Sequence, residues 1–202
     1  MIELPNACIV NKVVPKKIFY DKIQVSTSLK KEFVEKVDKI YWKYKISEDN
    51  LNISKTSNVE EIEVFQIILK EKYNAKNILN FIIKAIPYPI LFEIICNNEF
   101  IYAIQYDNDI IYSKWNENIE FEIDGLDLKS VYENIVRQVG NIVDNKTELK
   151  QEIEKQKYIT ELEKEIKALR NKIIQEKQFN RKVELNQKLR KLEKEMEELN
   201  NG

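Results

Sequence analysis

The stretch from Asn145 to Leu199 constrains this chain most, because its composition leaves few conformations open. It contains neither Gly nor Pro and is dominated by Glu, Lys, Leu, Gln and Arg. Its apolar residues recur at alternating spacings of four and three, which predicts helix with narrow seams, each suited to one partner helix. The first seam is Leu162, Ile166, Leu169 and Ile173, and the second is Leu185, Leu189, Leu192, Met196 and Leu199.

The two seams are out of phase. After Ile173 a heptad would next place apolar residues near 176 and 180, but Glu176 and Asn180 stand there. Either one helix of ~80 Å continues and pairs with a second subunit, or the chain folds back near 178–182 as an antiparallel hairpin. A hairpin lets one chain cover both seams. The absence of Gly and Pro at the break favours the continuous helix.

Aromatic content divides the chain into two predicted domains. Residues 1–143 carry almost all of the aromatic residues, including both tryptophans, whereas the last third has only Tyr158 and Phe179. The first part is long enough to bury a core of its own. We therefore expect a globular domain over 1–143 and a charged helical arm, as a coiled coil or an antiparallel helical hairpin, over 144–202.

Hydrophobic periodicity within residues 1–143 predicts an α+β fold, with a mixed or antiparallel sheet of about five or six strands and packed helices. Asn97-Asn98 and Asp107-Asn108 are typical of tight hairpin turns and predict an antiparallel meander. Helices are expected after Pro15, after a cap within Ser26–Ser28, over 74–86 and over 128–139. Strands are expected at 39–46, 59–69, 90–96, 100–106 and 110–115, with an edge strand at 120–123.

The residue types that are missing exclude most enzyme classes. There is no His, which removes the commonest general base and every His-ligated metal site, and three Gly are too few for a phosphate-cradling loop. Cys8 and Cys96 are too few for a disulfide framework or a thiolate zinc site, and are expected to be reduced core thiols. We expect no cofactor, and no small-molecule substrate is evident.

One catalytic class survives, because metal-dependent nucleases can work with carboxylates and a lysine. Glu61 and Glu63 lie two apart on a predicted strand, hence on one face, where the pair can share a magnesium ion. The alternative is the solvent-facing start of a strand whose second half is buried. The usual acid-x-lysine pairing is absent.

Basic residues give a second candidate, a nucleic-acid contact surface. Residues 39–46 alternate so that Lys39, Tyr41, Lys43 and Lys45 form a basic outer strand face, and residues 164–194 hold eleven Lys or Arg against four Glu. The alternative is that these charges are ordinary solvated faces. The residues expected to contact phosphates are Lys43, Lys45, Lys167, Arg170, Arg181, Lys182 and Arg190.

A third interpretation is a protein-interaction module, in which the arm forms a homo-oligomer or docks onto a helical protein partner. The contact would use Leu162, Ile166, Leu169, Ile173, Leu189, Leu192 and Met196. No signal peptide and no apolar run approaching a membrane span is present, so we expect a cytoplasmic protein without a membrane partner.

Several segments resemble an uncharacterised bacterial domain-of-unknown-function family over roughly residues 4 to 95. No catalytic residue can be carried over from it. The resemblance implies a gene neighbourhood beside restriction-type helicases and DNA methyltransferases. The similar segments are Leu4-Pro5, Asn11-Lys12, Pro15-Lys16-Lys17, Phe19-Tyr20, Phe33, Ile40 to Ile46, Asn52-Ile53, Val59 to Ile62 and Ile86-Pro87-Tyr88-Pro89, with the arm's Glu176 to Asn180 also similar.

Together these observations predict a non-enzymatic accessory protein that self-associates or docks through its arm, within a DNA-processing, restriction-like phage-defence system. The alternative hypothesis is a divergent metal-dependent nuclease that uses Glu61 and Glu63.

Overall fold

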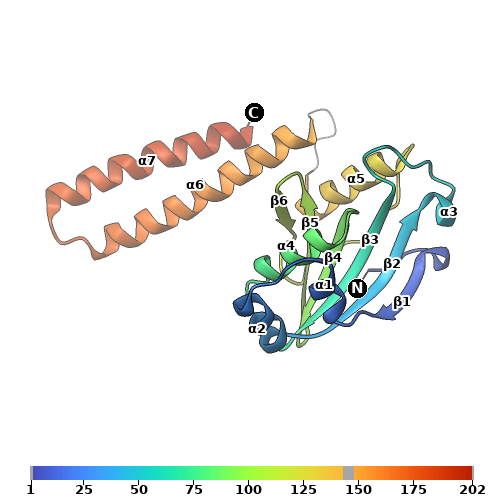
Figure 1. Ribbon diagram of the computed structural model, residues 1–202. Helices are drawn as coiled ribbons and strands as arrows, with labels where there is room; N and C mark the ends of the chain where they lie inside the picture. The colour runs from blue at the N-terminus through green and yellow to red at the C-terminus, as the bar shows by residue number, and fades with distance from the viewer. Residues whose placement is uncertain (1, 143–147, 202) are drawn as a thin grey trace. The chain divides into compact units, whose positions relative to one another are not determined.

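The computed structural model describes residues 2–142 and 148–201 of the chain (Figure 1). The chain forms two compact units, Met1–Val143 and Asp144–Gly202. We call the first the sheet domain and the second the hairpin. The junction expected at 143/144 falls within residues 143–147, outside the described part of the chain.

A single six-stranded sheet organises the sheet domain, with its strands in sequence order. All neighbouring strands are antiparallel except β3 and β4, which are parallel and are joined through a crossover helix. The predicted α+β class is confirmed. The strands are β1 (Ile9–Val13), β2 (Val37–Ser47), β3 (Glu61–Leu69), β4 (Ile90–Cys96), β5 (Glu99–Tyr106) and β6 (Asp109–Tyr112).

Helices cover both faces of this sheet. On one face α1, α2 and α4 form an apolar core with the strands, around Phe33, Phe65 and Phe92. On the other face α5 packs against β3, β5 and β6. The elements besides the strands are η1 (Asn6–Cys8), α1 (Lys17–Lys22), α2 (Thr27–Lys36), α3 (Glu48–Leu51), α4 (Lys76–Ala85) and α5 (Leu128–Gly140).

Local sequence explains where the two capped helices begin. The Ser26 hydroxyl accepts a hydrogen bond from the backbone N–H of Leu29 at 3.2 Å, so Ser26 is the cap of α2 among the three candidates. Asp127 accepts from the backbone N–H of Ser130 at 2.8 Å, while the Ser130 hydroxyl accepts from the backbone N–H of Asp127. This reciprocal capping box starts α5.

The expected edge strand at Glu120–Ile123 does not form, and β1 supplies the sixth strand instead. The backbone of Glu122 hydrogen-bonds to the Gln138 side chain of α5, through its N–H at 2.9 Å and its carbonyl at 3.0 Å. The Gln138 side-chain amide thus occupies the backbone N–H and C=O of Glu122, which strand pairing would need. At the opposite edge, β1 pairs with β2 with a bulge between Ile9 and Lys12.

The arm is an antiparallel hairpin of α6 (Leu149–Gln175) and α7 (Phe179–Asn201), so the expectation of one continuous helix is wrong. A three-residue connection, 176–178, suffices without Gly or Pro because Glu176 adopts extended backbone geometry after the last helical hydrogen bond. Folding back covers the seam of α6 within one chain: Leu162, Ile166 and Leu169 are buried. The seam residues of α7, from Leu185 to Leu199, are half-buried.

Polar contacts between the two helices support this register. Arg170 pairs with Glu193 at 2.6 Å and Lys188 pairs with Glu165 at 2.7 Å, and the Tyr158 hydroxyl donates to Glu195. These groups are largely exposed, so each contributes little to stability. The apolar seam is therefore the main stabilising contact. None of the described helices is long and apolar enough to span a membrane.

The hairpin offers a matched pair of substitutions on one helix. Ile166 is 4% exposed and Ile174 is 78% exposed. We expect Ile166→Ala to destabilise the hairpin by on the order of 2 kcal/mol or more, because it leaves a cavity in the seam. Amide hydrogen exchange of peptides from 149–201 should then accelerate by about 30-fold.

Ile174→Ala is the control and should leave exchange within about twofold of the wild type, because its side chain is already in solvent. Equal exchange rates for the two variants would contradict the hairpin packing.

Candidate functional site

A β-bulge in β2 determines which side chains meet at the end of β3. Trp42 pairs with Phe65 but Tyr44 pairs with Val64, so Lys43 is an extra residue in the ladder. An extra residue reverses the alternation of faces along a strand. Lys45 therefore lies on the same face of the sheet as Trp42, and it is the ladder partner of Glu63. The continuous basic face expected for residues 39–45 is wrong.

The bulge brings a lysine to the carboxylate pair that the sequence singled out. Lys45 Nζ lies 2.9 Å from Glu61 Oε2, and both side chains are about three-quarters buried. Lys43 instead donates to Asn11 Oδ1 at 3.1 Å. Of the two strand lysines expected to contact phosphates, Lys45 is thus engaged inside the sheet domain.

Glu63 is buried beside this pair, with 5% of its surface exposed. Its Oε2 is buried and has no hydrogen-bond partner among the described residues. Burial raises the pKa of the Glu63 carboxyl to about 7, the Trp42 indole opposes this shift, and the Glu61 charge adds to it. The carboxyl is therefore poised between its neutral and charged forms near neutral pH.

An apolar pocket of about 260 Å³ opens next to Glu63. Its wall includes Trp42 and Phe65, whose rings stack at 6.5 Å between centroids, and residues 86–88, which precede β4. Exposed Lys22 contributes a charge to the lining. This pocket is thus mostly hydrophobic, with the buried carboxylate of Glu63 in its wall.

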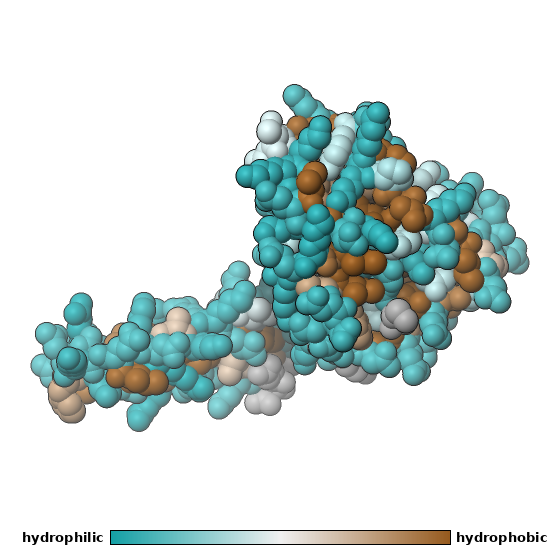
Figure 2. Space-filling model, turned by 90° about the horizontal axis from the view of Figure 1, so that it is seen from below, coloured by the Kyte–Doolittle hydropathy of each residue, from teal (hydrophilic) through white to brown (hydrophobic). Residues whose placement is uncertain are grey.

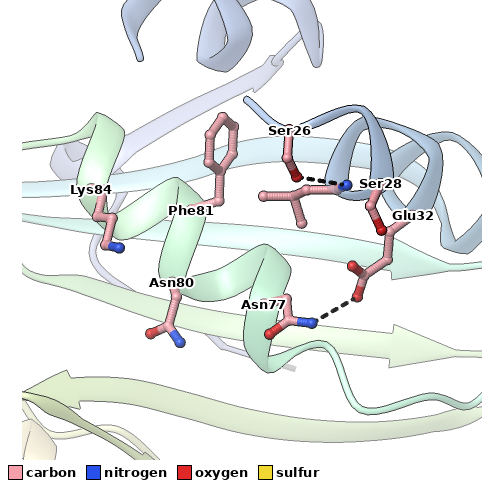
Figure 3. A pocket seen from close by; sticks show the side chains of 8 residues that line it. Ser26, Ser28, Glu32, Asn77, Asn80, Phe81 and Lys84 are labelled. Carbon is pink, nitrogen blue, oxygen red and sulfur yellow. Dashed lines mark hydrogen bonds between the residues drawn. The ribbon is translucent and has the colours of Figure 1, made fainter. Parts of the chain in front are cut away.

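A larger and more polar groove of about 360 Å³ lies between α2 and α4 (Figure 3). Three of its polar side chains, those of Ser26, Glu32 and Asn77, are already hydrogen-bonded within the fold. The Ser26 hydroxyl points to the α2 backbone, and the Asn77 amide faces Glu32 at 3.5 Å. Glu32 also accepts a hydrogen bond from the Tyr73 hydroxyl. The groove is therefore a weaker candidate than the pocket at Glu63.

A second buried carboxylate, Glu93, lies on the opposite face of the sheet. It accepts hydrogen bonds from the backbone N–H of Ile2 at 3.0 Å and from the Gln66 amide at 2.6 Å. Tyr102 of β5 is the ladder partner of Glu93 of β4, and burial raises the pKa of the Tyr102 hydroxyl to about 12. Both Glu93 oxygens have partners, so this carboxylate holds the N-terminal segment, whereas the buried Tyr102 hydroxyl has no hydrogen-bond partner among the described residues.

Charge is segregated along the hairpin. We define the loop half as residues 164–190, which contain the connecting loop, and the open half as residues 148–163 and 191–201. The loop half holds nine Lys or Arg against three Glu, and the open half holds five against nine. The predicted contact residues Lys167, Arg170, Arg181, Lys182 and Arg190 all fall in the loop half.

The model of a family described as a domain of unknown function, DUF4391, matches residues 2–196. The chain belongs to the DUF4391 family. No significant match is found among curated proteins or among solved structures.

The DUF4391 match extends well beyond the segment from 4 to 95 that carries the resemblance in the sequence, and includes most of the hairpin. The sheet domain and the hairpin are therefore both part of the family's domain. A function assigned to the family has to account for the hairpin as well as for the sheet.

The carboxylate pair of this DUF4391 domain is not surrounded by further ligands. No group of three or more His, Cys, Asp or Glu in the described ranges is placed to hold a metal ion. Glu61 is neutralised by Lys45, and Glu63 faces apolar side chains. Sequence reasoning placed Lys45 on the outer face and missed its ion pair with Glu61, because a bulge leaves no clear mark in a strand that alternates throughout.

The raised pKa of Glu63 predicts how stability depends on pH. Its folded-state pKa, about 7, is above the ordinary glutamate value of 4.5, so the native state retains a proton that the unfolded chain releases. This contribution is fully present below pH 4.5 and is lost as pH rises through 7. We expect Glu63→Gln to be more stable than the wild type at pH 8, by about 2 to 3 kcal/mol.

Urea denaturation followed by circular dichroism at pH 5 and pH 8 measures this difference. At pH 5 the difference should shrink to about 1 kcal/mol or less, because the wild-type carboxyl is then largely protonated in the fold and partly protonated in the unfolded chain. A constant difference between them at both pH values would contradict the assignment to Glu63.

Proposed function

We propose that this protein is a non-enzymatic accessory protein whose hairpin binds nucleic acid through its loop half. The observation that carries the proposal is the segregation of charge along the hairpin, which gives the loop half an excess of six positive charges. The chain as a whole has a formal net charge of −1. An excess of this size, gathered on one end of a narrow helical pair, suits a polyanion.

Most of these cations are available for contact. Arg170 and Lys188 form ion pairs across the hairpin, but the other seven make no ion pair with any residue in the described ranges. All seven are exposed. They are Lys164, Lys167, Lys172, Lys177, Arg181, Lys182 and Arg190.

The turn of the hairpin adds exposed apolar side chains to this basic surface. Phe179 is 79% exposed, Ile174 is 78% exposed and Val183 is 40% exposed. Figure 2 shows that the hairpin surface is otherwise mostly hydrophilic. A ring beside free cations offers a platform for an unstacked base, which favours single strands over duplex.

A helical protein partner is the second part of the proposal. The seam of α7, from Leu185 to Leu199, is only half-buried by α6, so an additional helix can extend the contact. The gene neighbourhood that the resemblance implies, beside helicases and DNA methyltransferases, supports a DNA-processing assembly as the setting. Self-association through the same strip is the alternative, and light scattering on the purified protein separates the two.

Neutralising three free cations near the turn tests nucleic-acid binding. We expect Lys172→Gln, Lys177→Gln and Arg181→Gln together to weaken binding of a labelled single-stranded DNA by about tenfold or more. The slope of log K against log salt should fall by ~2, because three phosphate contacts are lost. Fluorescence anisotropy across a salt series measures both quantities.

The control removes as many charges from the open half, with Lys155→Gln, Lys191→Gln and Lys194→Gln. It should change affinity by less than about threefold, since these lysines lie among nine Glu. Equal losses in the two triple variants, or no wild-type binding at low salt, would contradict the proposal.

The nuclease hypothesis is retained as the runner-up because Lys45 joins Glu61 and Glu63 in one cluster. Metal-dependent cleavage would require all three groups at the reacting phosphate. Cleavage of single- and double-stranded DNA in the presence of Mg²⁺ or Mn²⁺, compared with Glu61→Gln and Lys45→Ala, tests it. Any cleavage that both variants retain in full would remove these residues from consideration.

A further inference from the structure

We propose that the pocket beside Glu63 binds a small organic monocation, a primary ammonium group carried on an apolar or aromatic body. Nothing in this proposal depends on the hairpin or on its nucleic-acid contact. It rests on the shape and lining of the pocket, on the incompletely hydrogen-bonded carboxylate of Glu63, which lines it, and on the charge balance of the neighbouring side chains.

The unpartnered oxygen is the first argument. Buried polar atoms in proteins almost always have a hydrogen-bond partner, and leaving one without a partner is unfavourable. Glu63 is 5% exposed, lines the pocket and leaves Oε2 without a partner in the described part of the chain. The Trp42 indole N–H, a nearby donor, is used by the Tyr44 carbonyl at 3.1 Å. Glu63 Oε2 is closed off from solvent in the fold, so an ammonium group entering the pocket would supply the missing donor once the Glu63 carboxylate turns toward it.

Charge balance is the second argument. Lys45 is paired with Glu61, so the buried cluster of these two residues with ionised Glu63 carries one net negative charge. Lys22, the other charged residue of the lining, is exposed, so solvent screens its charge. A single positive charge neutralises the cluster. The fold has already removed the carboxylate from water, and the ligand therefore loses only its own hydration on binding.

The walls select an organic cation over a metal ion. Magnesium and calcium require about six oxygen ligands, whereas this pocket offers aromatic and aliphatic carbon around one carboxylate. The faces of aromatic rings attract ammonium groups, and Trp42, Phe65 and Tyr88 line the pocket. A volume of about 260 Å³ suits a ligand smaller than a typical drug molecule.

The experiment uses 2-phenylethylammonium as the probe and 2-phenylethanol as the neutral analogue with the same body. Both are titrated at pH 8 into the full chain carrying Trp115→Phe, so that Trp42 is the only tryptophan. We expect saturable quenching or enhancement of Trp42 fluorescence by the ammonium probe, with a Kd of ~1 mM or lower. The alcohol should bind at least about tenfold more weakly.

Glu63→Gln keeps the shape of the side chain and removes its charge. It should weaken ammonium binding by at least about tenfold and leave the weak binding of the alcohol unchanged. Equal affinity of the wild type for amine and alcohol, or equal amine affinity of the wild type and Glu63→Gln, would overturn the proposal. So would the absence of saturable binding by the wild type.

A second variant covers a failure of Glu63→Gln to fold. Lys22 is exposed at the pocket and can be changed without touching the core. Lys22→Glu adds a negative charge near the opening and should strengthen binding of the ammonium probe several-fold at low salt. Unchanged or weakened binding would count against a cation in this pocket.

Discussion

Strand β3 must bury both of its faces, and this requirement arranges the sheet domain. Ile62 and Val64 point to the face covered by α5, while Phe65 and Ile67 point into the core with α1, α2 and α4. Such a strand has to lie at the centre of a sheet with helices on both sides. Its neighbours follow from that: β2 pairs with it in antiparallel orientation, and β4 pairs in parallel after a crossover through α4.

Two buried carboxylates on the central strands have different roles. Glu63 and Glu93 interrupt the apolar pattern of β3 and β4, and they point to opposite faces of the sheet. Glu93 is satisfied by Gln66 and by the N-terminal backbone, and so serves the fold. Glu63 leaves an oxygen without a partner beside an apolar pocket. A fully satisfied buried carboxylate is explained by the fold alone, whereas the unsatisfied Glu63 is where we propose that a ligand binds.

Much of the fold could be predicted from the sequence, because strands and helices here follow clear periods. The meander from Ile90 to Tyr112 follows from its two tight turns, and the capping residues of α5 are visible in the sequence. The edge strand expected at Glu120–Ile123 does not form, because the Gln138 side chain of α5 hydrogen-bonds to the backbone N–H and C=O of Glu122. The continuous helix failed because extended geometry at Glu176 ends a helix as well as Gly does.

The candidate sites were harder to predict, since they depend on register. Glu61 and Glu63 were recognisable as a pair on one face, but the bulge at Lys43 was not, and it alone places Lys45 with them. The pocket was not visible because its walls come from segments far apart in the chain, β1 to α1, β2, β3 and the loop before β4. In the hairpin, the charged residues can be read from the sequence, but only the position of the turn at 176–178 shows that the positive ones gather in the loop half.

That separation of charge makes the hairpin an electric dipole. The sequence pI of about 5.9 describes an acidic molecule, which a cation-exchange resin would not be expected to retain at neutral pH. The loop half nevertheless carries a positive field that reaches about 10 Å into solution at 0.1 M salt. Retention on heparin or phosphocellulose would consequently report the local charge of the loop half of the hairpin and not the average charge of the molecule.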